Sequence, residues 1–202
     1  MKTKNEVHLT GGIVRINEAK NITSMTIATT VAGVDTAYPT VIFFYPDKTE
    51  EFKVGERVTI DGHFQLQVRE EDGKRKYKHS IVGDEIIKTQ RMLAPFIEDD
   101  NISKIAGGIK SDENYAYIFG IVKHIYVAAN GVVVLNVSVT DEDGHTNNCE
   151  VACFKRQALV AKTLKEEDFV MIAGSVQTRR ETSEKTVQNI VCRDILKCGQ
   201  QS

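Results

Sequence analysis

The feature that most constrains this chain is a strand pattern that occurs twice, at residues 55–67 and again at 168–178. In the first copy apolar residues occupy every second position, so one face of the strand is apolar and the other is polar. A glycine inside each copy predicts a bulge or sharp bend, which a small sheet needs in order to close on itself. At an offset of 112 residues, Val58, Ile60, Gly62 and Gln65 match Val170, Ile172, Gly174 and Gln177.

The repeat extends along the chain in both directions. Upstream, residues 12–15 match residues 120–123, and downstream, residues 81–88 match residues 190–197. The offsets drift by a few residues, as loop insertions between fixed strands produce. The shared order of these matches predicts two copies of one β domain. The expected boundaries are 1–90 for the first domain, 91–114 for a partly ordered linker and 115–202 for the second domain.

Five strands are expected in each copy. They lie near residues 6–16, 24–31, 38–45, 55–67 and 76–87, and near residues 115–125, 132–140, 147–154, 168–178 and 185–196. Between the third and fourth strands, residues 155–164 predict a short helix, whereas residues 46–53 are too few and too polar for one. Five strands with a helix, or its remnant, at this place is the plan of the OB barrel. The predicted fold class is therefore all-β, with two tandem OB-fold five-stranded barrels and one short helix.

The charge balance limits how this chain could bind nucleic acid. Its formal net charge is −2, and residues 1–90 hold 13 basic and 13 acidic side chains. Residues 115–202 hold 10 of each. Any nucleic-acid binding must therefore come from a local patch. The N-terminus lacks a signal-peptide apolar segment and no stretch approaches membrane-spanning length, so we expect a cytoplasmic protein without membrane contact.

Residue types typical of catalysis and metal binding form no recognisable constellation. The five histidines are scattered, and there is no nucleophile elbow, phosphate-binding loop or zinc-protease motif. The cysteine pairs Cys149–Cys153 and Cys192–Cys198 have loose spacing for zinc, and the first pair lies within a predicted strand. That position favours buried, reduced thiols over the alternatives of a zinc site or a disulfide. We expect a protein that is not an enzyme, with no metal and no cofactor.

Basic residues gather on one loop of each copy, the hairpin that joins the fourth and fifth strands. OB barrels use this loop to grip nucleic acid or sugar chains. Because both copies are otherwise neutral, these cations favour binding over the alternative of a solvated turn. The candidate binding residues here are Arg69, Lys74, Arg75, Lys76, Tyr77 and Lys78 in the first copy, and Arg179, Arg180 and Lys185 in the second.

The first copy resembles the bacterial and phage single-stranded DNA-binding proteins over most of residues 5–88. Residues 5–11, 25–29, 41–44, 55–62 and 77–82 look like that family's five strands in order. The second copy is similar mainly over residues 168–180. The resemblance implies an OB fold and a single-stranded DNA ligand.

The resemblance also implies roles for particular aromatic residues. It places Phe44 where the family has a base-stacking phenylalanine, and Tyr38 and Arg69 near two other stacking positions. In the second copy Phe154 matches Phe44, while Asn148 takes the place of Tyr38. The alternation of the third strand agrees, because Tyr38 and Phe44 fall opposite to Val41 and Phe43 if the latter two point inward. Packing of Phe44 in the core is the alternative.

Departures from the family pattern bear on the protein's role. The chain has no tryptophan, the first copy lacks the family's helix, and the chain ends at Ser202 without the family's acidic tail. These departures favour a specialised protein of a phage, plasmid or other mobile element.

The expected function is non-catalytic binding of single-stranded DNA, protecting or organising it in replication, recombination or transfer. RNA is an alternative ligand, and other replication or recombination proteins are expected partners. The competing hypothesis is an OB-fold scaffold or assembly protein that binds proteins. Because the family's common assembly presents four barrels, two chains of two barrels predict a homodimer.

Overall fold

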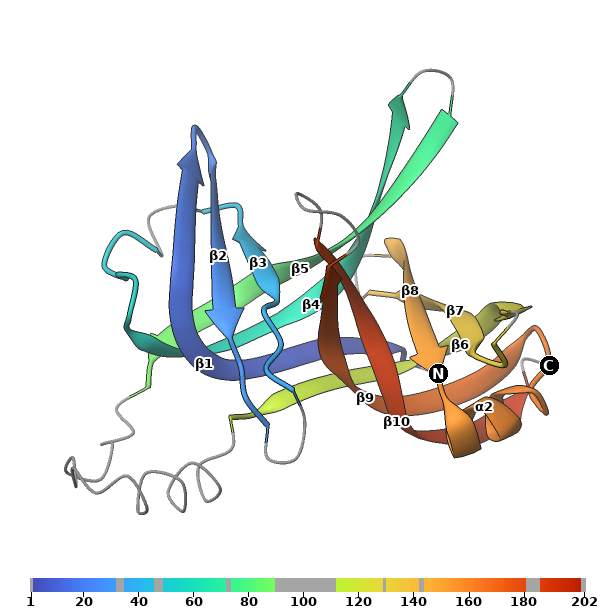
Figure 1. Cartoon of the computed structure of the whole chain (residues 1–202). Helices are drawn as coiled ribbons and strands as arrows, with labels where there is room; N and C mark the ends of the chain where they lie inside the picture. Colours follow the sequence, from blue (N-terminus) through green and yellow to red (C-terminus); the bar gives the residue numbers. More distant parts are fainter. Residues whose placement is uncertain are drawn as a thin grey trace, which may run out of the picture.

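The computed structural model describes residues 2–31, 35–45, 49–71, 74–89, 112–128, 130–141, 144–180 and 186–200. Within these ranges, the side chains of residues 67–71, 74–78, 180, 186 and 200 are not described. The described part of the chain forms strands and one short helix (Figure 1). In chain order the elements are β1 (Lys4–Ala19), β2 (Ile22–Ala28), β3 (Thr40–Phe43), β4 (Arg57–Glu71), β5 (Lys74–Lys88), β6 (Asn114–Val127), β7 (Val133–Thr140), β8 (Thr146–Cys153), α2 (Lys155–Ala161), β9 (Asp168–Arg180) and β10 (Thr186–Gln200).

The strands of the first half pair in a closed circuit. β1 pairs with β2 and β4, β2 pairs with β3, and β5 pairs with β3 and β4. The β3–β5 pair is parallel and the others are antiparallel. In the second half, β6 pairs with β7 and β9, β7 pairs with β8, and β10 pairs with β8 and β9. The predicted all-β class, with a closed five-stranded OB barrel and one short helix, is confirmed.

The sequence located each strand, but it overestimated β3, which covers only Thr40–Phe43, and it underestimated β1, β4, β5, β9 and β10. β1 continues to Ala19, and the β4–β5 ladder continues to the pair Glu71 and Lys74. In these extensions polar side chains replace the apolar alternation, because the strands have left the barrel and need only their backbone hydrogen bonds. The predicted helix at residues 155–164 is present as α2, which ends sooner, at Ala161.

Two glycines let strands approach each other closely where the barrels bend. Gly62 lies at a register shift in the β4–β5 ladder, and a Cβ atom there would lie 2.1 Å from the carbonyl oxygen of Val82. Gly174 lies opposite the shift between Cys192 and Asp194, and its Cβ would lie 2.6 Å from the carbonyl oxygen of Val191. No side chain fits at either distance, so the predicted role of the repeated glycine in a bulge is confirmed.

The two halves are joined by one antiparallel ladder between β1 and β6, which pairs Lys4–Leu9 with Asn114–Phe119. An asparagine on each of these two strands ties the strand to β4 or β9 of its own half. Asn5 Nδ2 donates to the Phe64 carbonyl (2.7 Å), and Asn5 Oδ1 accepts from the Phe64 N–H (3.0 Å). Asn114 makes the same two bonds with Val176, at 2.9 and 2.7 Å. The repeat of the sequence is therefore also a repeat of side-chain contacts.

The end of the predicted linker belongs to this joint. Asn114 is the first residue of β6, and Glu113 accepts a hydrogen bond from the Thr10 N–H through its carbonyl (2.8 Å). Asp112 is buried and pairs with Arg57. β6 therefore begins one residue before the expected start of the second domain, and polar contacts without an apolar pattern fix the two residues before it. Residues 90–111 lie outside the described residues.

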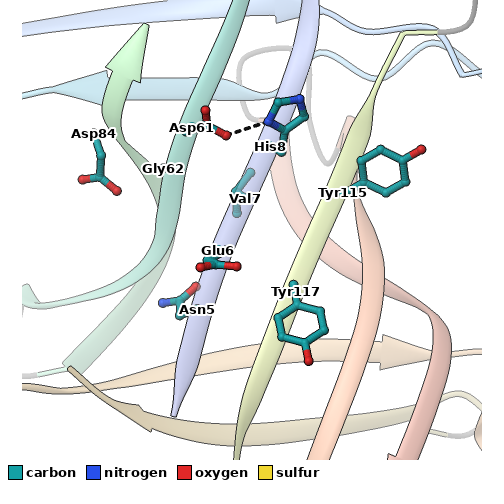
Figure 2. A pocket seen from close by; sticks show the side chains of 9 residues that line it. All are labelled: Asn5, Glu6, Val7, His8, Asp61, Gly62, Asp84, Tyr115 and Tyr117. Atoms are coloured by element: carbon teal, nitrogen blue, oxygen red, sulfur yellow. Dashed lines mark hydrogen bonds and ion pairs between the residues drawn. The ribbon is translucent and has the colours of Figure 1, made fainter. Parts of the chain in front are cut away.

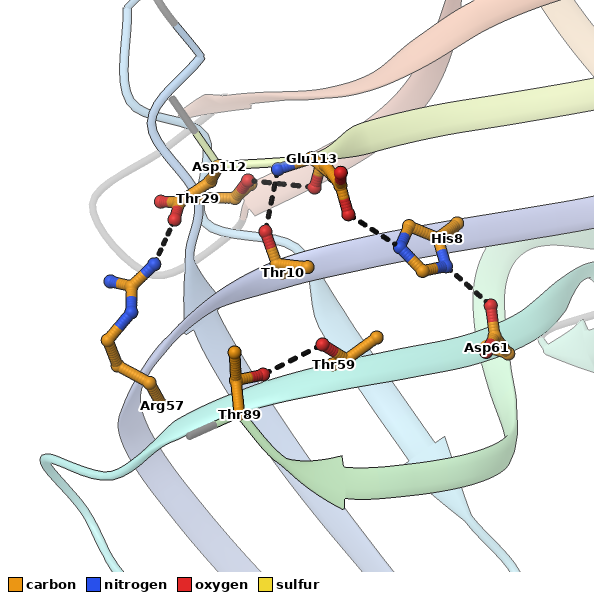
Figure 3. Close-up of polar contacts among 9 residues, drawn as sticks. All are labelled: His8, Thr10, Thr29, Arg57, Thr59, Asp61, Thr89, Asp112 and Glu113. Carbon is orange, nitrogen blue, oxygen red and sulfur yellow. Dashed lines mark hydrogen bonds and ion pairs between the residues drawn. The ribbon is translucent and has the colours of Figure 1, made fainter. Parts of the chain in front are cut away.

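A histidine lies between two carboxylates where the halves meet (Figure 3). His8 Nδ1 lies 2.6 Å from Asp61 Oδ1, and His8 Nε2 lies 3.1 Å from Glu113 Oε2. Partial burial by itself lowers the pKa of His8, but the hydrogen bonds to the two carboxylates outweigh it and raise this pKa above 6.5. Protonated His8 thus connects β1, β4 and the residue before β6.

We predict a pH dependence of folding from this histidine. Because the pKa of His8 is raised in the folded chain, its contribution to stability is fully present below about pH 6.5 and is lost as the pH rises through the folded-state pKa. The free-energy difference of unfolding between the wild type and His8→Gln should therefore be larger at pH 6 than at pH 9, as measured by urea denaturation. In a Glu113→Gln background the same comparison should show a weaker pH dependence. An equal difference at both pH values in the wild-type background would contradict the prediction.

Candidate nucleic-acid interface

Two aromatic side chains are exposed at the ends of β3. Val41 and Phe43 are fully buried, whereas Tyr38 and Phe44 are 48% and 41% exposed. Alternation along the strand therefore points Phe44 away from the core, as predicted, and the alternative of a core position for Phe44 is wrong. Tyr45, which the sequence did not single out, is 72% exposed next to Phe44. The adjacent aromatic residues Phe44 and Tyr45 at the end of a predicted strand could have indicated this exposed position in the sequence.

The hairpin of the first half projects as a long two-stranded ribbon beyond the barrel (Figure 1). The backbone register of this hairpin shows which candidate cations occupy positions of the same parity along the ribbon. Gln67 pairs with Lys78, Arg69 with Lys76 and Glu71 with Lys74, while the neutral pairs Val68–Tyr77 and Glu70–Arg75 alternate with them. Because successive positions alternate between the faces of a strand, four cations and one carboxylate fall at positions of one parity. The side chains of Arg69, Lys74, Arg75, Lys76, Tyr77 and Lys78 lie outside the described residues.

The second half repeats the arrangement in part. Phe154 follows β8 as Phe44 follows β3, and it is 43% exposed. Asn148, at the position matching Tyr38, is half-buried on β8. Arg179 is exposed on β9, while the Arg180 side chain and the whole of Lys185 lie outside the described residues.

The structure brings residues of the two halves together at Tyr38. The Tyr38 N–H donates to Thr178 Oγ1 (2.9 Å), on the hairpin that also carries Arg179. Thr178 and its cross-strand neighbour Gln188 were not predicted, because small polar residues on a strand give no pattern that identifies their contacts.

A groove of about 510 Å³ along the joint has the wrong charge for a phosphate backbone (Figure 2). Its lining includes Glu6, Asp61 and Asp84, together with His8, Tyr115 and Tyr117. Three carboxylates repel phosphates, so the exposed Tyr115 in this groove is not expected to meet a nucleic-acid strand.

Three of the four cysteines are buried. Cys149, Val151 and Cys153 share the buried face of β8, as predicted, and Cys192 lies beside Cys153. Burial raises the pKa of the Cys149 thiol to about 12, so this thiol stays protonated. Cys198 is only half-buried, so the expectation of a core thiol is wrong there. The strand register shifts between Lys197 and Gly199, which moves Cys198 out of the core pattern.

Two further features are absent from the described part of the chain. No group of three or more histidine, cysteine or acidic side chains there could hold a metal ion. No helix there is long and apolar enough to cross a membrane.

Comparison with solved structures places the whole chain beside one kind of protein. A deletion mutant of the single-stranded DNA binding protein from Thermus aquaticus matches with a TM-score of 0.72 at 15% identity, covering 100% of this chain and 97% of that chain. The wild-type form of that protein matches with a TM-score of 0.71 at 14% identity, covering 100% and 96%. At these identities the likeness shows the fold, an OB fold extending over the full chain. No protein-family model matches the chain, and no curated protein matches its sequence.

Proposed function

We propose that this chain is a non-catalytic single-stranded DNA-binding protein. The observation that carries the proposal is the exposure of Tyr38 and Phe44 on either side of β3, whose residues Val41 and Phe43 fill the core. Exposed aromatic rings together with cations that meet the phosphates are what sequence-tolerant binding of single strands uses, with each stacked base contributing about 1–3 kcal/mol. The solved structures that share the fold, named as single-stranded DNA binding proteins, support the same function.

The proposed domains are residues 1–90 and 115–202, each an OB barrel, and both contribute to binding. In the first, Tyr38 and Phe44 stack on bases while the cations of the β4–β5 hairpin meet phosphates. In the second, Phe154 and the cations Arg179, Arg180 and Lys185 do the same. The role is protection or organisation of single strands during replication, recombination or transfer. A phage or mobile-element setting gains no support from the comparisons and stays a prediction from the sequence.

Fluorescence anisotropy tests the proposal directly. Labelled single-stranded DNA, duplex DNA and RNA of equal length are titrated with the protein at two salt concentrations. We expect the single-stranded DNA to bind and its affinity to fall at the higher salt, because phosphate contacts release counterions. If the chain is instead a scaffold for proteins, no single strand will bind at micromolar protein and low salt.

The first hairpin gives a prediction of its own. Each phosphate contact contributes roughly 0.7 to the slope of log affinity against log salt for a single strand. Replacing Arg69, Lys76 and Lys78 together by alanine should therefore flatten this slope by up to about two units, for all base sequences alike. The control is Lys4→Ala with Lys123→Ala, which removes two exposed cations that lie outside the hairpin and pair with Glu6 and Glu167, and which should leave the slope unaltered. An unaltered slope in the triple variant would place the strand elsewhere.

We also propose that the protein is a homodimer. Closed two-fold dimers are the commonest homo-oligomers, and two chains would present four barrels. Light scattering should give twice the 22.5 kDa of one chain. A mass of one chain at working concentration would contradict the proposal.

A further inference from the structure

One edge of the backbone around Tyr38 bonds to the other half of the chain, while its opposite edge bonds to Thr29 and Ile27 of the same half. The parallel β3–β5 ladder covers only Val41 and Ile42. Upstream of it, the Tyr38 N–H donates to Thr178 Oγ1 (2.9 Å) and the Thr40 N–H donates to Gln188 Oε1 (2.9 Å). Gln188 Nε2 returns a bond to the Thr40 carbonyl (3.2 Å). Three backbone groups on both sides of the tyrosine are thus bonded by side chains about 140 residues away in sequence.

These contacts come from one face of one hairpin. Thr178 and Gln188 are directly opposite each other in the β9–β10 ladder, so their side chains lie on the same face of the ribbon. The next residue, Arg179, belongs to the opposite face and is exposed. The ribbon therefore docks on β3 through neutral amide and hydroxyl groups and keeps a cation in solvent.

The same docking occurs a second time with different side chains. Asn147, just inside β8, accepts from the Leu66 N–H of the first hairpin through Oδ1 (3.0 Å), and its Nδ2 donates to the Phe64 carbonyl. His79 Nε2 lies 3.7 Å from Glu150 Oε2, at the positions that match Gln188 and Thr40 in the repeat. Each half therefore places its hairpin on the third strand of the other half. A contact built twice from different residues is a feature of the architecture.

We propose that Thr178 and Gln188 are positioning residues for base stacking on Tyr38, so that the stacking surface of the first half is completed by the hairpin of the second. This rests on the proposed function. On one edge of this segment, Ala37 and Pro39 bond to Thr29 and Ile27 of the same half. On the other edge there is no ladder to β5 before Val41, and the bonds to Thr178 and Gln188 take its place, fixing the Tyr38 backbone from that side. A single strand stacked on Tyr38 then passes onto the ribbon that carries Arg179. The ligand is single-stranded nucleic acid, recognised by a base face and a phosphate.

A double-mutant cycle tests the proposal. Thr178→Val keeps the shape of the side chain and removes the acceptor, and Thr178→Ser keeps the acceptor. In the wild type, Tyr38→Ala should weaken single-stranded DNA binding by about five- to a hundred-fold. In the Thr178→Val background, Tyr38→Ala should weaken binding less than in the wild type, by at least about a factor of two. In the Thr178→Ser background, Tyr38→Ala should again have its full effect. The loss of affinity caused by Phe44→Ala should be equal in the wild type, in Thr178→Val and in Thr178→Ser. If Thr178→Val only lowered the stability of the whole protein, the effect of Phe44→Ala would change as well.

The outcomes separate this inference from the proposed function. If the wild type binds and Tyr38→Ala has the same effect in every background, the positioning role is overturned while the function stands. If the wild type binds no single strand, both fail. Amide hydrogen exchange tests the docking without DNA: the Tyr38 N–H should exchange faster in Thr178→Val than in the wild type. Equal exchange in the two proteins would overturn the inference.

Discussion

Replacing Phe44 by alanine is expected to weaken single-stranded DNA binding by about five- to a hundred-fold while leaving its salt dependence nearly unchanged. The ring is 41% exposed, whereas its neighbour Phe43 is fully buried, so the substitution removes a stacking surface and leaves the barrel interior intact. A stacked base involves no counterion release, and the slope of log affinity against log salt should therefore persist. Anisotropy titrations at several salt concentrations measure both quantities.

The control is Tyr115→Ala. Tyr115 is more exposed than Phe44, at 55%, but it lines the acidic groove along the joint. The Tyr115→Ala variant should bind single strands with the affinity of the wild type. Circular dichroism and thermal melting must show that both variants are folded. A folded Phe44→Ala protein with wild-type affinity would remove the stacking role of this residue.

Replacing Gly62 by alanine should destabilise the first barrel by about 3 kcal/mol or more. The added Cβ would lie 2.1 Å from the carbonyl oxygen of Val82, and this obstacle is backbone in a paired strand that cannot turn aside as a side chain does. Such a loss is a large share of the roughly 5–15 kcal/mol by which a typical domain is stable. Urea denaturation of the purified variant measures it.

A second glycine supplies the comparison. Gly12 also lies in a strand, but a Cβ atom there would meet nothing within 4 Å. Gly12→Ala should change the free energy of unfolding by no more than about 1 kcal/mol. If Gly62→Ala proves as stable as Gly12→Ala, the bulge beside Asp61 is not what closes the barrel.

The barrel strands could be predicted because their interior is apolar and their exterior is polar. The repeat around Gly62 and Gly174 marked the bends, and the alternation of Val41 and Phe43 fixed which face of β3 carries Phe44. These are the places where burial of apolar surface decides the structure.

The contacts between the halves could not be predicted in the same way. They depend on polar residues such as His8, Asn147, Thr178 and Gln188, which make hydrogen bonds to backbone or carboxylates far away in sequence. A single polar side chain on a strand faces solvent in most proteins, and only the closed topology brings its partner within reach. The candidate site was therefore predicted as two separate surfaces, and the structure adds the hairpin that joins them.

Competition at low salt tests single-strand binding most directly. A labelled single-stranded DNA oligomer is bound to the protein, and unlabelled single-stranded or duplex DNA of the same length is added. Stacking on Tyr38 and Phe44 requires unpaired bases, so the single strand should displace the label at far lower concentration than the duplex. Equal displacement by the duplex, or no complex at micromolar protein, would contradict a function in binding single strands.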